Sequence, residues 1–221
     1  MPLDLRTLDS VFIEKLEKEK VIAVVPVGSI EQHCDSPLAL DALIAERVAW
    51  LACQRLEERG KGYCIVFPTV YYGFSPEWAR VLGTVSLSSG TFLSVIHDIA
   101  KSIARWKLKR IAIVNGHTNN SGLIKAALYE ISLELDLKAA AIDYWRLCGI
   151  PLDHGGSVER AIAKALGIPV GSGNCREVSY SDGVLLSYVE GPSVIDFGKR
   201  EINIDDLIEP IVSALSKLLE K

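Results

Sequence analysis

Carboxylate and imidazole side chains lie at short spacings in the first fifth of the chain. Glu31 and His33 are two residues apart, and Asp41 follows them closely. In an extended segment, side chains two residues apart point to the same side, so Glu31 and His33 are expected to face one site. Such a mixture of nitrogen and oxygen ligands suits Zn²⁺, Mn²⁺ or Fe²⁺. The alternative is a polar loop in which Asp41 only caps a helix.

Two later segments carry the same chemistry. His117 ends the sequence Asn-Gly-His, and His154 begins the sequence His-Gly-Gly-Ser-Val-Glu, which ends at Glu159. The alternatives are an incidental histidine in a strand-to-helix turn and an acid that stabilises a helix N-terminus. The fourth histidine, His97, falls inside an expected helix and is given a structural or surface role. The other three follow expected strands, which favours a metal site built from these segments.

Strand and helix patterns alternate along the chain. Short apolar, β-branched runs predict strands over 21–27, 64–70, 110–114 and 138–143, and amphipathic spacing predicts helices over 41–59, 91–106, 120–135, 157–166 and 204–219. Gly90 or Thr91 is expected to cap the second of these helices and Ser157 the fourth. Residues 71–90 are expected to form a loop, and 184–189 is a further candidate strand.

This alternation predicts an α/β fold with a mostly parallel sheet and helices on both of its faces. Ligands of such sheets bind outside the carboxyl ends of the strands. The candidate ligands all follow expected strands, so we expect them to meet at one edge of the sheet.

Composition and length limit the class of protein. The chain has 221 residues and an ordinary globular composition, which predicts one domain over residues 1–221. No apolar run reaches the roughly 18 residues that a membrane helix needs. The acidic balance, with a pI of about 5.6, argues against nucleic acid as the main partner. The five cysteines are odd in number and form no Cys-x-x-Cys pair, so we expect no disulfide framework and a cytoplasmic location.

In these segments the sequence resembles the creatininase (creatinine amidohydrolase) family. The matching pieces, in family order, are PVGSIEQH (26–33), PLALDALIAE (37–46), GTVSL (83–87), IVNGH (113–117) with Asn120, and HGGSVE (154–159). The resemblance implies a three-layer αβα fold and a site with two divalent metal ions that hydrolyses amide-type C–N bonds of small molecules. It also implies assembly as a homo-oligomer, commonly a hexamer.

The resemblance further implies a role for each candidate ligand. One metal is bound by Glu31, Asp41 and His117, and the second by His33, the bridging Asp41 and a glutamate. In creatininases this glutamate follows the Asn-Gly-His histidine by two residues. That position is Asn119 here, so Glu159 takes the role instead. His154 matches the family's catalytic histidine, and its place in a Gly-Gly turn suits contact with substrate rather than with metal.

Some segments depart from the family pattern. The family often has Ser-x-Glu-His before its Gly-Thr motif, where this chain has Ser-Pro-Glu-Trp, ending at Trp78. Residues that face substrate are therefore expected to differ from those of creatininases. Trp78, Tyr144 and Trp145 are candidates for binding a substrate ring, and Arg80 and Arg146 for binding a phosphate.

These observations predict a metal-dependent hydrolase of a non-peptide amide in a small cyclic or formylated substrate. A formamidopyrimidine nucleotide is favoured over creatinine, and the family also contains peptide-trimming members. One alternative is a family member that binds metals without catalysis. Another is a phosphate-binding module, although the first strand precedes no Gly-x-Gly-x-x-Gly and the chain has no P-loop. A nucleophilic Cys34 would leave the acidic residues unexplained.

Overall fold

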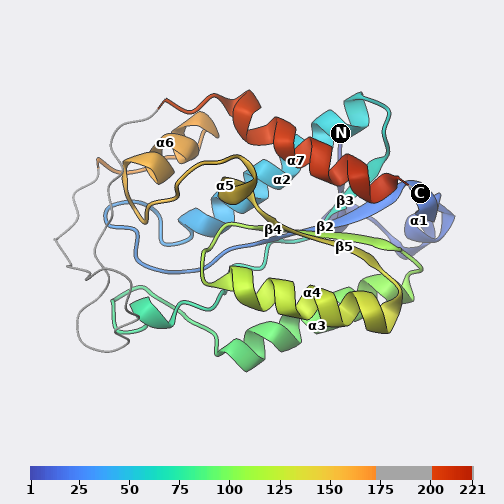
Figure 1. The fold of residues 1–221 in the computed structure, drawn as a ribbon, viewed down its shortest axis with the longest axis horizontal. Helices are drawn as coiled ribbons and strands as arrows, with labels where there is room; N and C mark the ends of the chain where they lie inside the picture. The colour runs from blue at the N-terminus through green and yellow to red at the C-terminus, as the bar shows by residue number, and fades with distance from the viewer. Residues whose placement is uncertain (173–200, 221) are drawn as a thin grey trace.

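Five parallel strands form a single sheet at the centre of the structure, a computed structural model that describes residues 1–172 and 201–220 (Figure 1). The strands are β1 (Leu3–Asp4), β2 (Val21–Val27), β3 (Tyr63–Val66), β4 (Arg110–Asn115) and β5 (Lys138–Asp143). Their order across the sheet is β1-β3-β2-β4-β5, and every neighbouring pair is parallel. β2 lies at the centre and is buried along its whole length, as its continuous apolar sequence predicts.

Helices cover both faces of the sheet, as Figure 1 shows. One face carries α2 (Leu40–Glu58), α5 (Tyr144–Leu147), α6 (Ser157–Ala165) and α7 (Ile204–Leu219), and the other carries α3 (Ser89–Arg105) and α4 (Asn120–Leu135). The short α1 (Ser10–Lys15) precedes β2. The predicted three-layer αβα fold with a parallel sheet is therefore confirmed. Among the described residues, no helix is both long and apolar enough to cross a membrane.

The two faces of the sheet bury separate apolar cores. Successive strand side chains point to opposite faces. Ile22 and Val24 of β2 accordingly pack with α2 and α7, whereas Ala23 and Val25 pack with α3 and α4. Both cores consist of fully buried aliphatic residues, and they fix the strand ends against which the polar loops pack.

Three expected element boundaries differ from the structure. β3 ends at Val66 rather than at residue 70, because Pro68 has no N–H to donate to a sheet ladder. α3 begins at Ser89, and its N-cap is Ser88, whose Oγ accepts a hydrogen bond from the Thr91 backbone N–H at 3.2 Å. The caps expected at residues 90 and 91 are therefore wrong. In α6 the N-cap is Gly156, and Ser157 is the first helical residue.

Six short elements of the described structure were not expected from the sequence. They are β1, α1, α5 and three 3-10 turns, η1 (Leu5–Thr7), η2 (Lys18–Lys20) and, inside the expected loop, η3 (Pro76–Trp78). Each is too short to show a periodic pattern. The candidate strand over 184–189 lies outside the described residues.

Glycines allow unusually close backbone contacts beyond the ends of β2 and β4. A Cβ added at Gly28, directly after β2, would lie 2.3 Å from the Ala42 backbone. A Cβ at Gly116, directly after β4, would lie 2.2 Å from the Asp41 carbonyl oxygen. A Cβ at Gly73 would lie 2.4 Å from the Gly28 carbonyl oxygen. These close approaches fix where Asp41 enters the region beyond the sheet.

We expect Gly28→Ala to destabilise the fold by about 1–3 kcal/mol, because the added methyl group must displace the α2 backbone. Gly122→Ala is the matched control. Within the described structure, a Cβ at Gly122 in α4 meets no atom closer than 4 Å, and alanine favours a helix by up to about 1 kcal/mol. Urea unfolding of both variants checks this. Equal stability of the two variants would show that the close packing at Gly28 is unimportant.

Candidate metal centre

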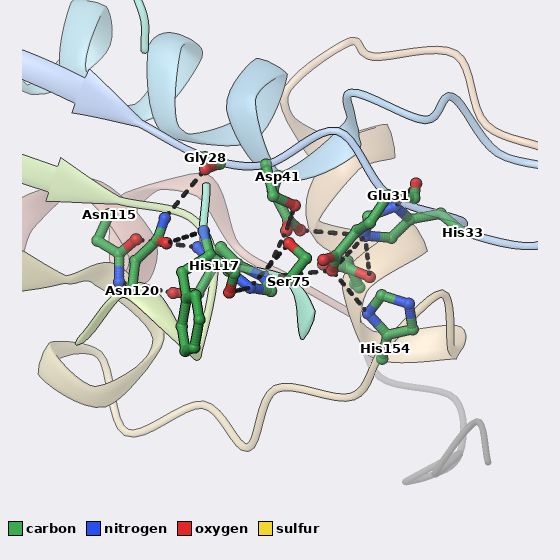
Figure 2. Close-up of polar contacts among 12 residues, drawn as sticks. Gly28, Glu31, His33, Asp41, Ser75, Asn115, His117, Asn120 and His154 are labelled. Atoms are coloured by element: carbon green, nitrogen blue, oxygen red, sulfur yellow. Dashed lines mark hydrogen bonds and ion pairs between the residues drawn. The ribbon is translucent and has the colours of Figure 1, made fainter. Parts of the chain in front are cut away.

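The six candidate site residues from the sequence meet at the carboxyl ends of the strands. Figure 2 labels five of them, Glu31, His33, Asp41, His117 and His154. They come from five segments of the chain: the loop after β2, the first turn of α2, the loop after β4, the segment between α5 and α6, and the first turn of α6. In chain order the six are Glu31, His33, Asp41, His117, His154 and Glu159. The structure thus brings together side chains that lie up to 128 residues apart in the sequence.

Five of these side chains are almost completely removed from solvent. The exposed fractions are 0% for Glu31, 0% for His33, 2% for Asp41, 3% for His117 and 1% for Glu159. Charged side chains are almost never buried to this extent without a partner. Their burial therefore needs compensating charge at the same place.

Two groups of three ligands share Asp41. In the first, His117 Nδ1 lies 3.2 Å from Glu31 Oε1 and 3.0 Å from Asp41 Oδ2. In the second, His33 Nε2 lies 3.1 Å from Asp41 Oδ1 and 3.7 Å from Glu159 Oε2. Within each group, the potential ligand atoms lie within 4.8 Å of one another. Asp41 presents one oxygen to each group, which is the arrangement of a bridging carboxylate.

Hydrogen bonds outside the cluster orient these ligands. His117 Nε2 donates to the Phe74 carbonyl oxygen at 2.9 Å, which leaves Nδ1 facing the carboxylates. His33 Nδ1 donates to the Glu31 carbonyl oxygen at 3.0 Å, which leaves Nε2 facing them. Ser29 Oγ donates to Asp41 Oδ2 at 2.8 Å. Partners of this kind fix the tautomer and ring orientation of histidines that bind metals.

The orphaned carboxylate of Glu31 tests whether metal ions fit this site. Both of its oxygens are buried, and neither accepts a hydrogen bond from any described residue. A buried carboxylate without a partner is costly. The cluster also buries three carboxylates, those of Glu31, Asp41 and Glu159. Their negative charge exceeds the positive charge that two histidines can supply. The donor set therefore fits divalent cations, which accept both carboxylate and imidazole ligands.

The pKa values of the histidines report the same excess of negative charge. Burial opposes protonation of His33, but the charges of Asp41 and Glu159 outweigh it and raise the His33 pKa to about 10. The pKa of His117 is likewise raised well above its ordinary value, against burial, by Glu31 and Asp41. Burial raises the pKa of Glu159 well above its usual range. Without metal ions, protons bound to the histidines supply the positive charge of the cluster.

His154 lies closer to the ligands than its glycine-rich turn suggests. Its Nε2 donates to the Gln32 carbonyl oxygen at 2.7 Å, and its Nδ1 lies 3.4 Å from Glu31 Oε1. Its side chain is 22% exposed, whereas those of His33 and Glu31 are fully buried. Burial and the neighbouring His33 lower the His154 pKa to about 4. His154 is therefore the histidine of the cluster that both reaches solvent and holds an unprotonated Nδ1 toward the ligands.

Of the three aromatic residues expected to bind substrate, one contacts the cluster. Trp78 stacks on His154, with ring centroids 4.4 Å apart. Tyr144 and Trp145 pack into the core beneath α2 and α7, where their rings meet edge to face at 5.2 Å. Arg146, expected to bind a phosphate, has its Nε 3.6 Å from Asp143 Oδ2.

Sequence reasoning missed Glu77 as a member of the site. Its Oε1 lies 3.9 Å from His117 Nε2, and its Oε2 is buried with no hydrogen-bond partner in the described part of the chain. Burial raises the Glu77 pKa above its ordinary value. The available signal was the Ser-Pro-Glu-Trp segment itself, which keeps the glutamate of the family pattern while changing the histidine.

The described cysteines form no disulfide framework. Cys53, Cys64 and Cys148 are free thiols, whereas Cys34 is disulfide-bonded. A cysteine held in a disulfide is not available as a nucleophile, which removes the observation on which a Cys34-based reaction depended.

Comparisons with known proteins agree with this architecture. The sequence model of the Creatininase family, described as creatinine amidohydrolase, matches residues 7–167, which include all six candidate site residues. The fold and the site are thus those of a class of metal-dependent hydrolases. The chain belongs to the creatinine amidohydrolase family.

The matches to individual relatives cover only part of the length of each protein. The chain is 27% identical over 172 residues to "Creatinine amidohydrolase" of Pseudomonas putida, covering 66% of this chain and 64% of that protein. It is 32% identical over 144 residues to "Mycofactocin precursor peptide peptidase" of Mycolicibacterium smegmatis, covering 64% of this chain and 56% of that one. The matches therefore span less than two thirds of these relatives.

Solved structures share the whole fold. A crystal structure of creatinine amidohydrolase (creatininase) superposes with a TM-score of 0.79 at 20% identity, covering 100% of this chain and 99% of that one. Other similar structures are described as a Zn-Zn type creatininase mutant, at 21% identity and a TM-score of 0.78, and as a manganese creatininase, at 21% identity and 0.74.

We expect Asp41→Ala to abolish binding of both metal ions, because Asp41 contributes an oxygen to each group. His117→Ala should weaken one site more than the other. Elemental analysis of purified protein, with a count of ions per chain, checks both. Glu46→Gln is the control, since this carboxylate accepts hydrogen bonds from Thr69 and Tyr71 outside the cluster. Retention of two ions by Asp41→Ala would disprove the shared ligand.

Metal affinity should rise with pH. His33 would bind metal as the neutral imidazole, yet its pKa without metal is about 10, so binding at neutral pH would release a proton. Each proton released makes affinity rise by up to about tenfold per pH unit below that pKa. Calorimetry in two buffers of different ionisation enthalpy measures the release. His33→Ala should release fewer protons, and a pH-independent affinity would contradict the charge arrangement.

Proposed function

We propose that the chain is a two-metal amidohydrolase that cleaves a non-peptide C–N bond in a small cyclic or formylated substrate. The observation that carries this is the pair of buried ligand groups that share Asp41, beside a glutamate whose oxygens accept no hydrogen bond from the described residues. Two-metal sites that activate water for hydrolysis are built from such ligands. Membership of the creatinine amidohydrolase family supports the same class of reaction.

Each residue has a defined part in this reaction. Glu31, Asp41 and His117 would hold one divalent ion, and His33, Asp41 and Glu159 the other. When bound, the ions supply Lewis-acid activation of water and of the substrate carbonyl. The protein residues fix where that activation takes place and exclude bulk water, since the ligands are buried.

His154 is the proton carrier in this proposal. Its Nδ1 is unprotonated and faces the cluster, and the Gln32 carbonyl oxygen holds its other nitrogen. A base in this position takes a proton during attack and returns it to the departing nitrogen. Such transfers contribute about 10²- to 10⁴-fold to the rate. The partial exposure of His154 lets it reach a substrate that enters from solvent.

A formamidopyrimidine nucleotide is the first candidate substrate, and creatinine is the second. A formamide offers little to bind at the reacting carbon, so the ring and phosphate must supply affinity. Arg146 Nε lies 3.6 Å from Asp143 Oδ2, and Arg80 and Arg146 both remain candidates for the phosphate in this hypothesis. Creatinine is supported by Glu77, whose buried oxygen has no partner among described groups and suits a substrate with N–H donors. We also propose a homo-hexamer and a cytoplasmic location, as the sequence suggests.

Turnover assays of the metal-loaded protein test the proposal. Formate release from the formamidopyrimidine nucleotide is expected to exceed creatine release from creatinine. Creatine production at an equal or greater rate would reject this preference. Turnover of neither substrate, together with cleavage of a peptide, would place the chain with its peptidase relatives. Removal of metal by a chelator should abolish whichever activity is found.

We expect His154→Ala to keep the fold and both metal ions and to lose at least about 10²-fold in kcat, because the proton carrier is gone. Metal content and kcat are measured on the same preparation. His97→Ala is the matched control, since His97 lies on α3 and pairs at 3.3 Å with Glu130. Loss of a metal ion in His154→Ala would make His154 a ligand, which its place beside Glu31 and His33 also permits geometrically.

A further inference from the structure

Three aromatic rings lie in series beside the metal ligands. His154 lies against His33, with ring centroids 4.5 Å apart and a 37° angle between the planes. It also lies against Trp78, with centroids 4.4 Å apart and an angle of 20°. The imidazole of His154 thus contacts a metal ligand candidate and an indole at the same time.

The backbone around His154 gives the ring little local support. Gly155 follows with a φ of +60°, and Gly156 then caps α6. A Cβ at Gly155 would lie 3.1 Å from Cys34 Sγ, so this turn passes closely beneath the loop after β2. Glycines lose much conformational freedom on ordering. The orientation of His154 therefore depends on its hydrogen bond to the Gln32 carbonyl oxygen and on the rings that pack against it.

Trp78, by contrast, is firmly anchored. Its side chain is 2% exposed, and it ends the 3-10 turn η3. The Trp78 N–H donates to the Ser75 carbonyl oxygen at 3.2 Å, and the Trp78 carbonyl oxygen accepts from the Val81 N–H at 2.8 Å. The Ser75 N–H in turn donates to Ser86 Oγ at 2.9 Å. The indole is a fixed surface at the position where the family pattern has a histidine.

We propose that Trp78 is a positioning residue for His154, holding the imidazole by ring stacking so that Nε2 meets the Gln32 carbonyl oxygen and Nδ1 faces the reacting groups. This rests on the proposed function, in which His154 carries the proton. It replaces the expectation that Trp78 binds substrate, because a nearly buried indole covered by His154 offers little surface to a ligand.

Substitution of Trp78 separates this role from substrate binding. Trp78→Leu removes the flat ring and should lower kcat by about 10- to 100-fold, as expected for a misplaced catalytic group, while KM changes by less than about threefold. Trp78→Phe keeps an aromatic face and should recover most of kcat. Trp106→Leu is the matched control, because Trp106 stacks on Phe67 at 5.7 Å and belongs to the core beneath α3 and α4.

Three outcomes overturn the proposal. The first is an unchanged kcat in Trp78→Leu. The second is a rise in KM with kcat unchanged, which would make Trp78 a substrate-binding residue. The third is loss of metal from a folded Trp78→Leu protein, which would show that Trp78 supports the ligands instead. If Trp78→Leu does not fold, a kcat for Trp78→Phe within about threefold of wild type supports the proposal, and a larger loss overturns it.

A fluorescence cycle tests the contact without any substrate. The His154 ring is part of the surroundings of the Trp78 indole, so His154→Ala should change the tryptophan emission of the metal-loaded protein. The change should persist in a Trp106→Phe background and disappear in a Trp78→Phe background. An equal change in both backgrounds, or no change at all, would overturn the stacking. Because this readout needs no turnover, it distinguishes a failure of the positioning role from a failure of the proposed function.

Discussion

The site buries more negative charge than the positively charged groups of the protein can balance, and the arrangement of its side chains depends on this constraint. Asp41 is the centre of this constraint, because its two oxygens face different histidines and Ser29 holds one of them. Glu31 adds a carboxylate that accepts no hydrogen bond in the described structure. Divalent cations, or protons in their absence, must supply the missing charge. The position of every other group in the site follows from that requirement.

The fold meets this requirement through backbone contacts at the end of the sheet. Gly28 and Gly116 allow the start of α2 to lie directly against the ends of β2 and β4, where side chains would clash. Asn120 bridges the same region, donating to the Gly28 carbonyl oxygen at 2.9 Å and accepting from the Phe74 N–H at 2.9 Å. Cores on both faces of the sheet keep these contacts rigid, so the ligands are held before any metal binds.

The segment between β3 and α3 contributes more than its loop-like composition indicates. Its Phe74 carbonyl orients His117, Glu77 lies beside the same ring, and Trp78 stacks on His154. These groups lie on the outer side of the histidines, away from the shared Asp41. In the proposed reaction, substitutions in this segment would act first on His154 and on the orientation of His117.

The sequence by itself predicted the parallel sheet, its helices and the six residues that meet at its edge. Strand and helix periods are local properties, and the carboxyl ends of parallel strands necessarily share one edge. Only the tertiary structure revealed the contacts of Glu77, of the Phe74 carbonyl and of Trp78 with the histidines, and it placed Tyr144 and Trp145 in the core. Contacts between distant segments, backbone acceptors and buried unpaired oxygens leave no periodic signal in a sequence, because they arise only when the packed chain brings those groups together.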